Sequence, residues 1–164
     1  MTHRPYLTAL LLLALGACED EGDSGDETCT YAGSLSGDIA SALPGSGVSC
    51  VTQFSGGDGI DVEYVTVSDP TVRVDLVIDA VTKGMTGDGF PTEVRVLNDD
   101  LDIWASLACT VDISEHSLIG PAELGNESWQ VRGVGRCDSA LARDGGGTIT
   151  LTPFEFATTV TWTD

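Results

Sequence analysis

The stretch Leu101–Ser114, LDIWASLACTVDIS, decides the fold. From Leu101 to Ile113, thirteen residues, the odd positions are apolar and most of the even positions are polar. Side chains of a strand alternate between two faces, so this pattern predicts one long β-strand with a single buried face. Trp104 and Ala108 are the exceptions, and this phase places both on the outer face.

The same period of two recurs on both sides of this stretch. It predicts further strands over 60–67, 72–80, 94–96, 128–138 and 149–162. The change of phase from Tyr64 to Val65 predicts a bulge, and Pro153 predicts a bulge or a sheet edge because proline cannot donate to a strand ladder. Gly133 and Gly135 share the buried face of 128–138, where they leave room for a bulky residue opposite or mark a bulge.

Clusters of Gly, Asp, Ser and Pro separate these strands at intervals of roughly ten to twenty residues. The sequence therefore predicts an all-β protein, an antiparallel β-sandwich or flattened barrel of about 8–9 strands. Only 37–43 and 139–143 are expected to hold a helical turn. The length of 164 residues suits one domain, which we place at 29–164.

The first eighteen residues have the pattern of an export signal. Leu7–Ala17 is an apolar run of eleven residues, shorter than the roughly 20 that span a bilayer. Leu15-Gly16-Ala17-Cys18 resembles the lipobox of bacterial lipoproteins. The resemblance implies that a signal peptide, residues 1–17, is removed and that Cys18 is lipidated, which anchors the protein to a membrane of the cell envelope. The alternative is an ordinary secreted protein cleaved after Ala17.

Residues 19–28, EDEGDSGDET, hold six acidic side chains and no aliphatic one, so they are expected to form a solvated linker. The remaining 20 acidic and 6 basic side chains give residues 29–164 a net charge of −14. This charge excludes nucleic acid as a partner bound through lysine and arginine, because such binding depends on neutralising phosphate.

Four cysteines remain after Cys18, and an even number in an exported domain predicts two disulfides. Metal binding is the alternative, but zinc ligands usually occur in closer pairs than these. Of the three connectivities we favour Cys29–Cys50 and Cys109–Cys137, because Cys109 and Cys137 both fall on buried strand faces.

Catalytic residues are scarce in the sequence. His116 is the one histidine left after residues 1–17, and its neighbours Ser114 and Glu115 cannot form a triad with it merely by adjacency, because neighbouring strand residues point to opposite faces. We expect His116 to lie in a solvated loop at the end of the strand and to have no catalytic role. A hydrolase with paired carboxylates is a remote alternative.

Calcium is the cofactor to consider, because Asp/Gly loops supply clustered oxygen ligands. The candidates are Asp58 and Asp61 in Gly56–Asp61, which resembles one copy of the calcium-binding nonapeptide repeat, and Asp99, Asp100 and Asp102 in the next acidic loop. The alternative is that both segments are plain hairpin turns without a bound metal. Trp104, if exposed, would anchor a protein partner or a sugar ring; the alternative is that a second sheet or a loop covers it.

These observations favour a non-catalytic binding or structural module, exported and lipid-anchored in the envelope, at the outer membrane, in the periplasm or on the cell surface. Its partner would be an envelope protein or a glycan. A calcium-dependent carbohydrate-binding or adhesion domain is the second hypothesis.

Overall fold

Eleven antiparallel strands make up the part of the chain that this computed structural model describes, residues 29–43, 48–52, 59–66, 71–121 and 126–162. No helix occurs within those ranges, so the predicted all-β class is confirmed. The strands are β1 (Thr30–Gly37), β2 (Ser41–Leu43), β3 (Val48–Thr52), β4 (Gly59–Thr66), β5 (Arg73–Asp79), β6 (Gly87–Leu97), β7 (Ile103–Pro121), β8 (Glu127–Cys137), β9 (Leu141–Arg143), β10 (Thr148–Leu151) and β11 (Phe154–Trp162).

The expected number of about 8–9 strands was too low because the shortest strands escaped the pattern. β2 and β9, of three residues each, lie where helical turns were expected. Strands this short show too little alternation to be recognised in a sequence, although each pairs with a strand next to it along the chain, β2 with β1 and β9 with β10.

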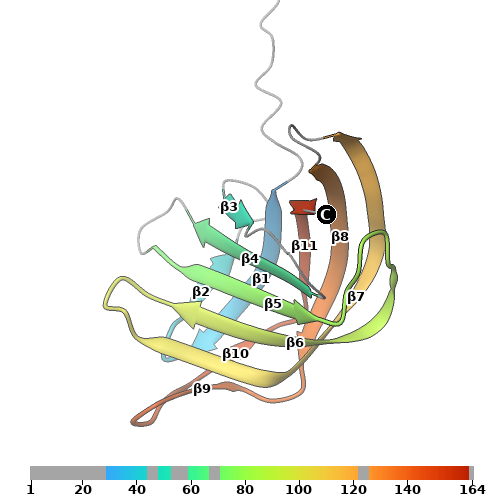
Figure 1. Cartoon of the computed structure of the whole chain (residues 1–164). Helices are drawn as coiled ribbons and strands as arrows, with labels where there is room; N and C mark the ends of the chain where they lie inside the picture. Colours follow the sequence, from blue (N-terminus) through green and yellow to red (C-terminus); the bar gives the residue numbers. More distant parts are fainter. Residues whose placement is uncertain (1–28, 44–47, 53–58, 67–70, 122–125, 163–164) are drawn as a thin grey trace, which may run out of the picture.

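One sheet runs in the order β3-β4-β5-β6-β7-β8-β11-β1-β10-β9, and β2 pairs with β1. The sheet closes at one side because β9 also pairs with the first part of β7, through Trp104 opposite Arg143 and Ala105 opposite Ala142. β7 is therefore shared by two layers, one containing β3 to β6 and one containing β8, β11 and β1 (Figure 1).

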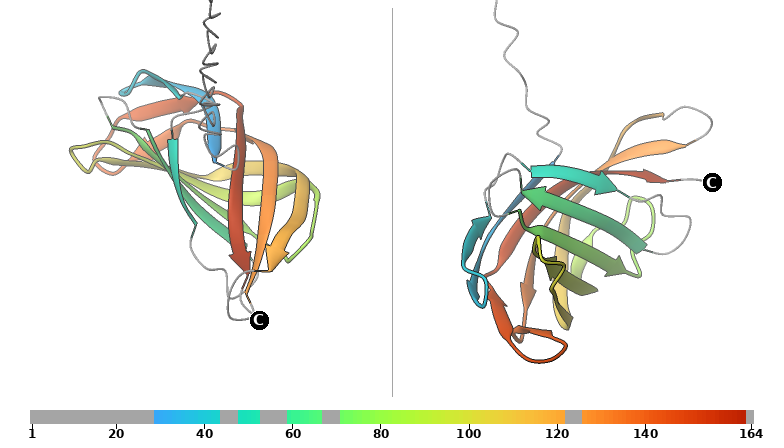
Figure 2. Two further views of the ribbon diagram at one scale, coloured as in Figure 1. Left: turned by 90° about the horizontal axis from the view of Figure 1, so that it is seen from above. Right: turned by 90° about the vertical axis from the view of Figure 1, so that its left-hand side faces the viewer.

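The core lies between these two layers, which cross at an angle (Figure 2). Tyr31 of β1 and Tyr64 of β4 meet there with their ring centroids 5.0 Å apart. The Tyr64 hydroxyl donates a 3.2 Å hydrogen bond to the Ala157 carbonyl of β11, which joins the two layers directly. This sandwich-like packing buries apolar side chains from both layers.

The long strand β7 departs from the prediction at its beginning. Between the partners of Thr92 and Val94, β7 carries one residue more than β6, which is a β-bulge before Cys109. The bulge reverses which positions face inward, so Cys109, Val111 and Ile113 are buried as predicted, whereas Ile103 and Leu107 are exposed. Leu101 is also exposed, in the turn before β7. The prediction that one buried face runs from Leu101 to Ile113 is therefore wrong for its first half.

The same bulge explains why Trp104 faces the core and not the outer face that the sequence predicts. It is only 2% exposed, so the interpretation of Trp104 as an exposed anchor is wrong, and the alternative that it is covered is correct. Its indole Nε1 donates a 3.3 Å hydrogen bond to Asp38 Oδ2, and the Arg143 guanidinium lies 5.2 Å from the ring centroid.

Two more bulges occur further along β7, because two steps on β7 face one step on β8 between Ile113 and Glu115 and again between Leu118 and Gly120. The first of these turns His116 inward. His116 is buried within the strand, so the expectation of a solvated loop residue is wrong.

In β4, by contrast, the predicted bulge is absent, because Thr66 continues the alternation as a buried residue and its Oγ1 accepts a hydrogen bond from the Val72 amide.

The two glycines of β8 make room for rings, as predicted. A Cβ atom on Gly135 would overlap the Phe154 ring, lying 2.5 Å from Cε2, and one on Gly133 would lie 2.8 Å from Phe156 Cε1. Both phenylalanines belong to β11, which pairs with β8 residue by residue. The predicted break at Pro153 is also present, since β10 ends at Leu151 and β11 begins at Phe154 while both pair with β1.

Both predicted disulfides, Cys29–Cys50 and Cys109–Cys137, are confirmed. Cys109 and Cys137 are direct cross-strand partners on β7 and β8. Cys29 immediately precedes β1 and Cys50 belongs to β3, which is not hydrogen-bonded to β1, so this disulfide connects the two layers at the side that β9 does not close.

Candidate functional site

An aliphatic surface lies where β7 begins. Its members are Leu101, Ile103 and Leu107, which we call the distal patch; Leu107 is 79% exposed and Leu101 77%. The bulge before Cys109 turns Ile103 and Leu107 away from the core that their sequence pattern predicted, and Leu101 is exposed in the turn that precedes β7. Exposed aliphatic groups that gather on one face are typical of a surface that binds a partner.

One arginine, Arg95, lies on the sheet face of the distal patch. Arg95, opposite Ala105 on the neighbouring strand, is held by two hydrogen bonds of 2.7 and 2.8 Å to Glu93. Arg143 lies on the other face of β7, where it pairs with Trp104, covers its ring and donates a 2.6 Å hydrogen bond to Asp102. Arginine is enriched in protein interfaces, and its carboxylate partner here fixes it in place beside aliphatic side chains.

The predicted calcium ligands are not brought together by the structure. In the turn between β6 and β7, Asp99 Oδ2 accepts a hydrogen bond from the Thr71 amide, whereas Asp102 binds Arg143, so these two carboxylates have different partners. Asp100 is exposed in the same turn. The turn is closed by Asn98, whose Oδ1 accepts from the Asp102 amide.

Asp61 lies on β4, two strands away from β6, and Asp58 lies outside the described residues. Over the described ranges, no group of three or more His, Cys, Asp or Glu side chains is placed to hold a metal ion. Calcium binding through Gly56–Asp61 stays a prediction.

An acidic face on β4 and β5 contains Asp61 but forms no metal centre. Asp75 stands opposite Glu63 on one side and Arg95 on the other. Burial, followed by the negative charges of Glu63 and Asp61, raises the pKa of Asp75 to about 6, against the weaker opposing effect of Arg95 and Arg73. One oxygen of this carboxylate, Oδ1, is buried and has no hydrogen-bond partner among the described residues.

The sequence interpretation missed an aromatic cluster around His116. Its ring lies 5.3 Å from Trp129 and 5.8 Å from Trp162, between centroids. Trp162 Nε1 donates to His116 Nε2 at 3.2 Å, so the proton of the neutral imidazole is on Nδ1, which donates to the Met85 carbonyl at 3.0 Å. Burial lowers the pKa of His116, and the hydrogen bond to Met85 partly opposes this effect.

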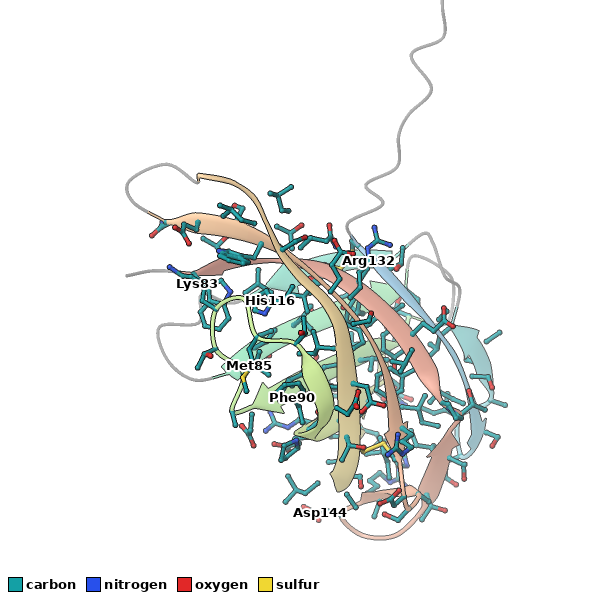
Figure 3. All side chains as sticks on the ribbon, turned by 90° about the vertical axis from the view of Figure 1, so that its right-hand side faces the viewer. Lys83, Met85, Phe90, His116, Arg132 and Asp144 are labelled. Atoms are coloured by element: carbon teal, nitrogen blue, oxygen red, sulfur yellow. A yellow bond between two sulfur atoms is a disulfide. The ribbon has the colours of Figure 1, made fainter. Side chains whose placement is uncertain are left out.

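The turn between β5 and β6 covers this cluster. Figure 3 shows Lys83 and Met85 of this turn on the same side as His116. Lys83 forms a 3.0 Å ion pair with Glu127, and Glu127 accepts a 3.1 Å hydrogen bond from Trp129 Nε1. Both imidazole nitrogens are engaged in holding the fold, so the geometry gives His116 a structural role.

No pattern in the sequence identifies the distal patch or the aromatic cluster. The patch residues looked like core, and the only hint was that Trp104 and Ala108 broke the pattern on the supposed outer face. The cluster joins residues from three strands and one turn, a set that spacing along the chain does not reveal.

Comparison with known proteins finds no matching family model, no matching curated sequence and no matching solved structure. Within the described residues, no helix is long and apolar enough to cross a membrane.

Proposed function

We propose that this protein is a lipid-anchored, non-catalytic binding module of the bacterial cell envelope, which holds the distal patch toward a protein partner. The observation that carries the proposal is the position of the Cys29–Cys50 disulfide. It fixes the first described residue of the domain, eleven positions after the lipobox cysteine Cys18.

The disulfide suits a tethered domain for a mechanical reason. Tension on an anchor reaches the fold at Cys29, the residue that precedes β1. Without a crosslink, that tension would pull on the β1 backbone hydrogen bonds from their end. The bond to Cys50 transmits the tension to β3 as well, so that both layers of the domain share it.

The distal patch favours a protein partner over a glycan. Sugar-binding clefts present exposed aromatic rings. Trp104 is the aromatic residue near the distal patch that the sequence predicts to be exposed, and it is buried. Aliphatic side chains beside an arginine that a carboxylate holds in place, as Glu93 holds Arg95, are typical of protein–protein contact. The non-catalytic part of the proposal rests on His116, whose two nitrogens are engaged by Trp162 and Met85.

The anchor is tested by Cys18→Ser in the full-length protein. We expect wild-type protein in the membrane fraction, resistant to a high-salt wash, with a mass that includes acyl chains and lacks residues 1–17. The variant should remain unprocessed and lose these acyl chains. Equal masses for the two proteins, apart from the substituted atom, would refute the lipid anchor.

The binding surface is tested by crosslinking on intact cells. Leu107→Asp places a charge in the distal patch, and Asp144→Asn is the control, because Asp144 is an exposed residue of the β9–β10 turn outside the patch. We expect the crosslinked partner to be lost in the first variant alone. A crosslinking pattern that both variants share with the wild type would refute a role for the patch.

A further inference from the structure

Leu101 has a backbone conformation that leucine seldom adopts. Its φ is +63°, in the left-handed region, where the Cβ atom crowds the backbone and glycine is favoured. Within the described residues, Ala80, with a φ of +60°, is the other non-glycine residue in this region. Leucine at position 101 therefore makes the fold less stable than glycine would.

The hydrogen bonds of the turn between β6 and β7 impose this conformation. The Leu101 amide donates to the Asn98 carbonyl at 3.1 Å, which closes a four-residue turn. The next amide, that of Asp102, donates to Asn98 Oδ1 at 3.0 Å. In hairpins of this kind the residue that follows the turn is left-handed, and it is usually glycine.

The side chain of Leu101 contributes little to the core of the domain. It is 77% exposed, so packing within the domain does not compensate for the strained backbone. Glycine at this position would relieve the strain and lose little apolar contact. A strained residue with an exposed apolar side chain is typical of a binding site, where a partner supplies the missing contacts.

The turn places Leu101 at the projecting end of the distal patch. Leu97, the last residue of β6, pairs with Ile103, the first residue of β7, at the base of the turn. Figure 1 shows this turn, in yellow, projecting at the left-hand edge of the domain. A side chain in a projecting turn suits a pocket, whereas Ile103 and Leu107 lie on the flatter surface of the sheet.

Aspartates flank Leu101 on both sides along the chain. Asp99 and Asp100, which precede it, are exposed, and Asp102, which follows it, is partly exposed. Asp102 is paired with Arg143, and residues 29–164 together carry a net charge of −14. An apolar side chain with an acidic border is complementary to an apolar pocket that has lysine or arginine at its rim.

The same charges disfavour two other occupants of the distal patch. In a symmetric dimer formed through this patch, the aspartates of one copy would lie near those of the other. A bilayer surface would have to take up the carboxylates together with the leucine, and burial of unpaired charge is costly. Charge complementarity therefore favours a basic protein surface.

We propose that Leu101 is the anchor of the distal patch and inserts into an apolar pocket, rimmed by lysine or arginine, on the protein partner. This inference rests on the proposed binding function and names the chemistry of the partner. Contacts in the complex compensate for a residue that weakens the isolated domain. Leu101→Gly should therefore stabilise the domain and weaken binding, two effects in opposite directions.

The first part of the test compares the stability of two glycine variants of the full-length protein in detergent. Leu101→Gly and Ala80→Gly relieve left-handed backbones of the same kind, and Ala80 is exposed in the turn at the other end of β5 and β6. We expect both substitutions to raise Tm by about 2 °C. A Tm that rises in Ala80→Gly but not in Leu101→Gly would overturn the inference.

The second part measures binding on intact cells. The photocrosslinking amino acid p-benzoylphenylalanine replaces Ile103, and the adducts are digested and mapped by mass spectrometry. We expect equal yields of one protein adduct with Leu101 present and with Ala80→Gly, and a yield lower by about tenfold or more with Leu101→Gly, because burial of a leucine side chain contributes at least that factor to affinity. The mapped segment should carry apolar residues flanked by lysine or arginine.

The outcomes separate this inference from the proposed function. Equal adduct yields in Leu101→Gly and Ala80→Gly overturn the role of Leu101, while the distal patch remains a binding surface. The absence of a protein adduct from every variant overturns the binding surface and the inference together. An adduct to a second copy of this chain, to lipid or to a segment without lysine or arginine overturns the inferred partner.

Discussion

Ile103 and Ile113 lie on the same strand at positions of the same parity, and the sequence pattern places both in the core. In the structure Ile113 is 3% exposed, whereas Ile103 is 47% exposed. Replacing each with alanine removes the same three carbon atoms and the same β-propensity, so the difference between the two variants reports the difference in burial. This pair therefore tests the bulge before Cys109 directly.

For Ile113→Ala, three buried carbons at about 0.8 kcal/mol each contribute about 2.4 kcal/mol. The cavity left behind brings the loss of unfolding free energy to roughly 3 kcal/mol. For Ile103→Ala, only about half of the transfer free energy is at stake and no closed cavity forms, so we expect a loss of about 1 kcal/mol. In a domain of roughly 140 residues, the difference of about 2 kcal/mol separates the two melting temperatures by about 7 °C.

The assay is thermal unfolding followed by circular dichroism at neutral pH, with both disulfides intact. We expect Tm to fall in the order wild type, Ile103→Ala, Ile113→Ala. Melting temperatures of the two variants that agree within about 2 °C would mean that both isoleucines are equally buried. The bulge, and with it the distal patch, would then be refuted.

Gly135→Ala should lower the unfolding free energy by about 2 kcal/mol, because the added Cβ overlaps the Phe154 ring. Gly120→Ala is the control: no atom lies within 4 Å of the added Cβ, so the unfolding free energy should change by less than about 0.5 kcal/mol. Urea unfolding of both variants measures the difference. Asp75→Asn should stabilise the protein by about 1 kcal/mol above pH 7, a value reduced because solvent still reaches part of the side chain. That gain should shrink as the pH falls through 6 toward 4.5, because the wild-type carboxyl, with its raised pKa, takes up its proton in the folded state first; a gain that does not depend on pH would contradict the cause given for the raised pKa. His116 has a lowered pKa when folded, so the unfolded chain binds the proton first, and stability should fall as the pH drops below about 6.5. Urea titrations at pH 7.5 and 5.5 should show a smaller loss in His116→Gln than in the wild type, and equal losses would exclude His116 as the source.

Much of the fold could be predicted because alternation and cysteine count are local properties of the chain. The all-β class and both disulfides followed from them, and so did the space that Gly133 and Gly135 leave for rings. The bulges of β7 could not be predicted, because a bulge is defined by the partner strand. Nothing between Ser106 and Cys109 shows that β6 has one residue fewer opposite them.

The same limit explains why the candidate surfaces were missed. Ile103 has the same odd parity as the buried residues after Cys109, so the sequence predicts that it is buried too. The alternation along the sequence is the same with or without a bulge between them, and in the structure Ile103 is exposed. The inward direction of His116 depends on the bulge between Ile113 and Glu115. The sequence does not reveal this bulge, so it predicts a solvated His116. In both cases the error is one residue of register, which is enough to exchange the two faces of a strand.

The three bulges of β7 connect the fold to the proposed function. A nineteen-residue strand without them would keep one face inward along its whole length and could serve only one layer. At the bulge before Cys109, β7 exchanges β9 for β8 on one side, while its pairing with β6 on the other side continues to Ile113. The first and the third bulge also expose aliphatic side chains, Ile103 and Leu107 at one end and Leu118 and Ile119 at the other, whereas the second turns His116 inward. The bulge that lets β7 join β8 therefore also exposes the distal patch that we propose as the surface for a protein partner.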